Sequence, residues 1–164
     1  MNFIIESTLK TLNKSKSLLS KISDEQLCNT SVSPYYSSIG SHVRHILDFY
    51  ECILNCENNL VDLTDRKRDQ NVENLTDSAL EYLEVINQRL KLLTSPLDQE
   101  IIVVDDMGMG KVKIKYTLSS LLAQANSHTI HHYAIINYIL DGLNIEFNEE
   151  QFGLNPTTQR KIVN

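Results

Sequence analysis

The chain has 164 residues, a formal net charge of −6 at pH 7 and 41% hydrophobic residues. This length predicts one domain over residues 1–164, and the acidic balance argues against a nucleic-acid partner because phosphate binding needs a basic face. No apolar run approaches the roughly 20 residues of a membrane span, and the three cysteines lack the spacing of a disulfide framework, so we expect a cytoplasmic protein without a membrane partner.

Apolar residues at helical spacing predict four long helices. The first runs from about Phe3 to Lys21, and the second from about Ser38 to Asn58, after a break at Ser31–Pro34. The second helix has only a narrow polar stripe, so we expect it to pack against two neighbours. The third begins at Thr76, which we interpret as its N-cap, and it stops before Ser95-Pro96.

The fourth helix is expected from about Leu118 to Leu140, with Gly142 placed as its C′ glycine. A different pattern separates the third and fourth helices. Residues 101–104 are β-branched, residues 112–116 alternate between apolar residues and lysines, and the two glycines of residues 105–110 lie between these runs. This pattern predicts a small β-hairpin with one exposed face.

The remaining segments are irregular. Residues 59–75 are polar, and we interpret them as a long crossover loop whose basic cluster, Arg66-Lys67-Arg68, is solvated. The tail from Asn144 is expected to dock through its aromatic residues, Phe147 and Phe152. The predicted fold class is all-α, an up-down four-helix bundle with the long crossover after the second helix and the hairpin between the third and fourth helices.

All five histidines fall in two short stretches, residues 38–45 and 127–132. Imidazole is the commonest protein ligand for a transition metal. His128 and His132 are four residues apart, so on a helix they point the same way, and the other stretch can supply a third imidazole from a neighbouring helix. Three histidines without a fourth protein ligand are typical of a catalytic metal site, because one position stays open.

Helical projection separates the five histidines only in part. His128 and His132 lie within the apolar face of the fourth helix, whereas His131 lies toward its edge and is interpreted as a bystander. On the second helix, the projection places His42 closer to the apolar centre than His45. Pattern alone therefore slightly favours His42 as the third ligand, and His45 stays open as the alternative.

Other polar and sulfur-bearing residues lie near the histidines in sequence. Asp48 follows His45 by one helical turn and Gln124 precedes His128 by one turn, so either side chain is a candidate to orient an imidazole. Cys52 lies about 10 Å along the helix axis from His45, too far to share an ion with it. We interpret Cys52 and Cys56 as small buried hydrophobic residues.

The sequence resembles the DinB-like four-helix-bundle superfamily, which includes bacillithiol S-transferases and mycothiol-dependent isomerases. The stretches 38–48 and 128–134, with their order and separation, carry this resemblance. The family pattern has one ligand on the second helix, followed by an aliphatic pair and a polar residue, and then His-x-x-x-His on the last long helix. It implies His45, His128 and His132 as metal ligands. Family members often have Arg-Gly after the last ligand, where this chain has Tyr133-Ala134.

The resemblance also implies a function. A divalent transition metal, with zinc or nickel favoured, would bind a low-molecular-weight thiol as its thiolate and direct it at an electrophilic small molecule; the resemblance further suggests a homodimer. Two other functions are compatible with the same residues. One is a non-catalytic, stress-associated bundle that binds a metal or another ligand, and the other is a metal-dependent hydrolase. No residue stands out in the sequence as a general base.

Overall fold

The computed structural model describes residues 2–158. Within this range the chain is mostly helical, as predicted, and it has a small sheet. In chain order the elements are α1 (Phe3–Leu19), α2 (Asp24–Leu27), α3 (Ile39–Leu54), β1 (Leu60–Asp62), α4 (Gln70–Asn74), α5 (Thr76–Lys91), β2 (Glu100–Asp106), β3 (Lys111–Thr117) and α6 (Leu118–Gly142).

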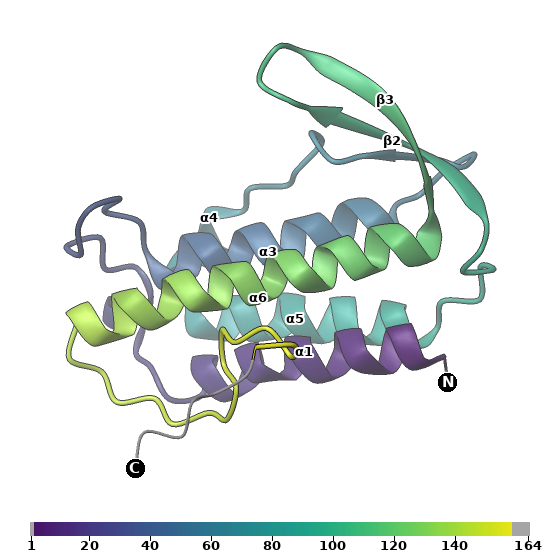
Figure 1. The fold of residues 1–164 in the computed structure, drawn as a ribbon. Helices are drawn as coiled ribbons and strands as arrows, with labels where there is room; N and C mark the ends of the chain where they lie inside the picture. Colours follow the sequence, from purple (N-terminus) through teal and green to yellow (C-terminus); the bar gives the residue numbers. More distant parts are fainter. Residues whose placement is uncertain (1, 159–164) are drawn as a thin grey trace.

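The four long helices lie side by side around a hydrophobic core (Figure 1). Helix α3 packs against α5 and α6, and α1 packs against the same two helices. Tyr50 of α3 and Tyr133 of α6 are among the largest fully buried side chains of this core. The wide apolar face of α3 therefore meets two long neighbours, as its narrow polar stripe predicts. Over residues 2–158, no helix combines the length and apolarity needed to cross a membrane.

The predicted hairpin forms, but it is part of a three-stranded sheet. Strands β2 and β3 pair antiparallel from Glu100–Thr117 to Asp106–Lys111, and β1 adds to the other edge of β2 in parallel. The interpretation of residues 59–75 as one loop was therefore wrong, because they also contain β1 and α4. Such short elements show no apolar period. The hairpin projects above one end of α3 and α6 (Figure 1).

Two predicted helix caps were also wrong. Thr76 is the first residue of α5, and its N–H and Oγ1 both donate to Asp24 Oδ1, at 2.7 and 2.8 Å. Asp24 belongs to α2, a helix that was not predicted. Its carboxylate thus accepts the hydrogen bond of a backbone N–H at the start of α5 that has no partner within the helix. Gly142 is the last residue of α6 rather than its C′ residue. Asn144 takes the left-handed conformation there, with φ 54°, and the helix closes with a bond from Ile145 N–H to Leu140 O.

The first two long helices end earlier than predicted: α1 ends at Leu19 rather than Lys21, and α3 ends at Leu54 rather than Asn58. The tail after α6 is irregular up to residue 158, as predicted. Its Phe152 is buried and stacks on Tyr133, with ring centroids 4.3 Å apart, and Phe147 packs edge-on against Phe152. These contacts hold the described part of the tail against α6.

Helix α4 is seated on α3 through a close backbone approach. A Cβ atom at Gly40 would lie 1.9 Å from the carbonyl oxygen of Glu73, so only glycine fits there. Arg44 reinforces the contact, because its Nε donates to a carboxylate oxygen of Glu73. The segment between β1 and α4 is therefore anchored at both ends: β1 pairs with β2, and α4 packs on α3.

Candidate metal centre

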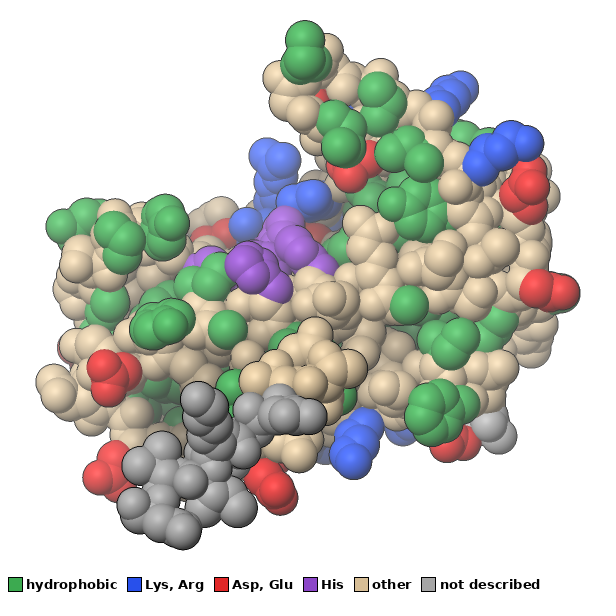
Figure 2. All heavy atoms as spheres, viewed as in Figure 1, with side chains coloured by type: hydrophobic (Ala, Val, Ile, Leu, Met, Phe, Trp, Pro, Cys, Tyr) green, Lys and Arg blue, Asp and Glu red, His purple; other side chains and the backbone are tan. Residues whose placement is uncertain are grey.

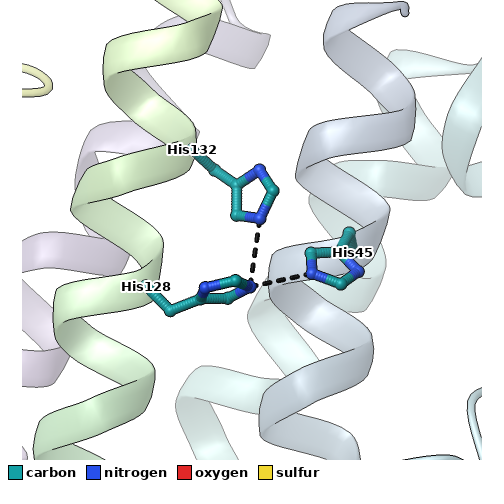
Figure 3. Close-up of side chains that lie close together, drawn as sticks. All are labelled: His45, His128 and His132. Carbon is teal, nitrogen blue, oxygen red and sulfur yellow. Dashed lines mark hydrogen bonds between the residues drawn. The ribbon is translucent and has the colours of Figure 1, made fainter. Parts of the chain in front are cut away.

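Three histidines from two helices converge between α3 and α6 (Figure 3). His45 Nε2 of α3 lies 2.8 Å from His128 Nε2 of α6, and His132 Nε2 lies 3.0 Å from the same atom. One ligand atom from each residue can be chosen so that all three lie within 4.8 Å of one another. The four-residue spacing on α6 gives two of the three positions directly, and the packing of α3 on α6 supplies the third.

Burial keeps these imidazoles neutral at pH 7. Burial, followed by the neighbouring imidazoles, lowers the pKa of His132 from 6.5 to about 2. Burial, followed by the positive charge of Arg66, lowers the pKa of His45 to about 3. The pKa of His128 is also lowered, mainly by burial and then by His131. A neutral imidazole is the form that ligates a metal.

The hydrogen-bonding capacity of the three rings fits a shared cation. In a neutral imidazole each ring nitrogen has either one N–H or one lone pair. His128 Nε2 faces two other Nε2 atoms, and it cannot make a well-directed hydrogen bond to both. Nitrogens on one ion, with bonds of about 2.1 Å, lie roughly 3.0–3.4 Å apart. An ion that accepts one lone pair from each ring would therefore satisfy all three with small ring movements.

The other two histidines lie outside this cluster. His42 Nδ1 is 2.8 Å from His132 Nδ1, and its Nε2 is 2.8 Å from Ser37 Oγ, so His42 lies behind His132 and contacts its far nitrogen. His131 is exposed, with its ring centroid 5.5 Å from that of His132. The structure thus brings together the histidines that the resemblance implies, and not the set that helical projection slightly favoured.

The two candidates for orienting an imidazole, Asp48 and Gln124, do not do so in the structure. Asp48 is fully buried, and its carboxylate accepts from Arg44 Nη1 at 2.8 Å, from Tyr82 Oη at 3.2 Å and from the backbone N–H of Arg68 at 3.2 Å. Gln124 is exposed. Within residues 2–158, no hydrogen bond joins either side chain to a histidine. Asp48 instead ties α3 to α5 and to the segment before α4.

Arg66 is the site residue that the sequence did not predict. Its Nη1 donates to His45 Nδ1 at 2.9 Å, and its Nε donates to Leu63 O at 2.9 Å. The only sequence signal was a basic cluster in an acidic chain, and that pattern is usually a solvated loop. Figure 2 shows the histidines at the surface in a hollow below the hairpin, with basic side chains beside them.

Cysteine does not join the cluster. Cys52 is buried, and its Sγ lies 3.3 Å from the carbonyl oxygen of Asp65. Burial raises the pKa of the Cys52 thiol to about 11, so it is protonated at neutral pH. Cys56 is half-buried, and burial raises the pKa of its thiol as well. Both residues therefore lack the thiolate form that binds metals.

Comparison with known proteins finds similarity among solved structures. No protein-family model matches the sequence, and no curated protein matches it. Among solved structures, the chain is similar to YjoA, a DinB-like protein from Bacillus subtilis, with 25% sequence identity and a TM-score of 0.65. The match covers 90% of this chain and 97% of YjoA. The chain therefore has the fold of the DinB-like superfamily.

Proposed function

We propose that the chain holds one divalent transition-metal ion through His45, His128 and His132 and transfers a low-molecular-weight thiol to an electrophilic small molecule. The observation that carries the metal site is the convergence of three neutral imidazoles from α3 and α6. Imidazole-only ligation suits late first-row ions, and we propose zinc or nickel. The choice of thiol transfer rests on the DinB-like resemblance.

The donor set supports a catalytic rather than a structural site. Structural zinc sites are closed by four protein ligands, whereas catalytic sites have three and keep an open position. Histidine side chains reach the surface below the hairpin (Figure 2), and His45 and His128 are half-buried rather than buried, so a small molecule has access to them. Because all three ligands are neutral, a bound divalent ion would keep its full charge and would lower the pKa of a thiol beside it.

The protein's own residues hold the ligands in place. His42 contacts the far nitrogen of His132 and so fixes the orientation of that ring. Phe49 packs edge-on against His128, with ring centroids 5.3 Å apart and planes at 90°. Such fixed rings keep the open side of the site in one direction. A thiol acidified in this way would lose its proton to solvent, and its sulfur would form a bond to the electrophilic carbon as the leaving group departs as an anion.

The setting of the protein is also part of the proposal. The chain's three free cysteines fit a reducing, cytoplasmic environment, and we propose a homodimer on the resemblance alone. The up-down arrangement of the four long helices is proposed on the same basis. No step of the thiol transfer described above depends on a second subunit.

Metal analysis of the purified protein tests the site. We expect about one zinc or nickel ion per chain in the wild type and a loss of stoichiometric metal in His128→Ala. His131→Ala is the matched control, because His131 lies on the same helix but is exposed, and it should keep its metal. A wild type without stoichiometric metal after incubation with zinc or nickel would overturn the proposal.

An assay with a model electrophile, such as monobromobimane, tests the reaction. The zinc-loaded wild type should accelerate its consumption only when a thiol such as cysteine is added, and His128→Ala should not. Turnover that does not depend on the thiol would favour a hydrolase. Stoichiometric metal without any turnover of a panel of electrophiles would favour a non-catalytic metal-binding bundle.

A further inference from the structure

Among the half-buried arginines of residues 2–158, Arg66 differs in having no ion pair with an acidic side chain. Arg44 pairs with Asp48 and Glu73, and Arg89 pairs with Glu51. For Arg66, by contrast, the described residues offer no ion pair. Arg66 donates hydrogen bonds to the carbonyl oxygen of Leu63 and to His45 Nδ1. Arg66 is thus a half-buried guanidinium beside a cluster of neutral imidazoles, with no direct ion pair among the described residues.

The contact between Arg66 and His45 specifies one tautomer of that imidazole. A guanidinium only donates hydrogen bonds, so His45 Nδ1 must accept with its lone pair. The single proton of the neutral ring is then on Nε2, the atom that faces His128 Nε2 at 2.8 Å. A metal ion needs the lone pair of that same Nε2. The hydrogen bond from Arg66 and a bond from His45 Nε2 to a metal therefore require different tautomers of His45.

Metal binding would reverse this arrangement. If His45 Nε2 gave its lone pair to an ion, the proton of the neutral ring would be on Nδ1, and Nδ1 would be a donor. Arg66 Nη1 and His45 Nδ1 would be two donors facing each other, and the divalent charge would add repulsion. The hydrogen bond from Arg66 to His45 cannot survive in that state.

We infer that Arg66 leaves His45 when the metal binds and that its guanidinium then binds an anionic oxygen group, such as a carboxylate, on the molecule held at the open position. This inference rests on the proposed metal site. A divalent ion with neutral ligands and an unpaired guanidinium together attract an anion, and the guanidinium fork matches a carboxylate. The charge of Asp105 on β2 also acts on His128, in the direction opposite to that of Arg66.

The first test measures metal affinity and needs no turnover. Zinc affinity by chelator competition should be roughly tenfold tighter in Arg66→Met than in the wild type, because the ion no longer has to displace a hydrogen bond to a charged group. Lys67→Met is the matched control: it removes the adjacent positive charge, and its zinc affinity should stay near the wild-type value. Equal or weaker binding by Arg66→Met would overturn the inference.

The tautomer can be observed directly. Nitrogen chemical shifts of the His45 ring in the metal-free wild type should show a protonated Nε2 and an unprotonated Nδ1. In Arg66→Met the preference for this tautomer should weaken, and Arg66→Lys, which keeps a cationic donor, should restore part of it. A wild-type ring with its proton on Nδ1 would contradict the argument. Circular dichroism of each variant checks that the fold is unchanged.

The second test concerns the anion. Nickel-loaded wild type should bind 3-mercaptopropionate roughly tenfold more tightly than the neutral 3-mercaptopropionamide, since Arg66 pairs with the carboxylate. Arg66→Met should lose this preference, and an unchanged preference would overturn the anion role.

The metal-site proposal and the Arg66 inference are contradicted by different results. If neither protein binds zinc or nickel, the metal site itself is wrong and both proposals fall; if both bind equally, only the role of Arg66 is wrong.

Discussion

Replacement of Asp48 by asparagine separates a structural role from a metal-orienting one. Asp48 has 0% of its side chain exposed and accepts hydrogen bonds from Arg44, Tyr82 and the Arg68 backbone. Breaking a buried pair by neutralising one partner costs about 3–5 kcal/mol. Arg44 keeps its second partner, Glu73, and is itself 15% exposed, so we expect the lower end of that range, about 3 kcal/mol.

Urea unfolding of the metal-free protein measures this loss. With a slope of about 2 kcal/mol per molar urea, the midpoint of Asp48→Asn should fall by about 1.5 M. Glu73→Gln is the control: it removes the other partner of Arg44, at a side chain that is 18% exposed, and it should cost about 1 kcal/mol or less.

Zinc affinity is the second measurement to make on the Asp48→Asn variant. Asp48 contacts no imidazole in the structure, so the folded Asp48→Asn protein should bind zinc as the wild type does. Loss of a residue that orients a ligand weakens metal binding by roughly 10–100-fold. A variant with wild-type stability and zinc binding weakened to that extent would refute the structural role and restore the one suggested by sequence spacing.

Three further outcomes are expected. The metal-free protein should lose roughly 1–2 kcal/mol of stability between pH 7 and pH 5, after allowance for solvent screening. In the folded protein the pKa of His45 is about 3 and the pKa of His132 is about 2, both below the ordinary 6.5. The unfolded chain therefore binds more protons than the folded protein as the pH falls below 6.5, and this favours unfolding. Urea unfolding at both pH values measures the loss, and equal stability at pH 7 and pH 5 would contradict it. Gly40→Ala should lower the melting temperature by several degrees, because its Cβ would lie 1.9 Å from a backbone oxygen of α4; an unchanged melting temperature would show that the two helices separate easily. Iodoacetamide at pH 7.5 should label exposed Cys28 well before buried Cys52, whose pKa is raised to about 11; mass spectrometry gives the order, and faster labelling of Cys52 would mean that α3 opens readily.

The parts of the fold that the sequence predicts are those with long repeats. Helices α1, α3, α5 and α6 each show apolar residues over several turns, so their existence follows from local pattern. Helix α2 and strand β1 are four and three residues long, and such lengths contain no complete period. They form because of distant partners: Asp24 of α2 accepts from Thr76, and β1 pairs with β2.

The same distinction applies to the candidate site. The pairing of His128 with His132 is a property of one helix and follows from their spacing alone. The choice between His42 and His45 depends on how α3 lies against α6, and projection of a single helix does not contain that information. The contact of Arg66 with His45 depends on the anchoring of a loop at both ends. Residue type and local spacing predict neither contact.

The anchoring of the segment that carries Arg66 determines how fast the proposed movement of this side chain would be. Arg66 lies between β1, held by β2, and α4, held against α3 at Gly40. Between these ends the backbone N–H of Arg68 also donates to buried Asp48, so we expect Arg66 to move by rotation about its own side-chain bonds. Such rotations take picoseconds to nanoseconds, whereas lid motions take about microseconds to milliseconds. Metal capture and anion binding should then follow single-exponential kinetics, with rates set by the arrival of each ligand and no lag from a slow closing step.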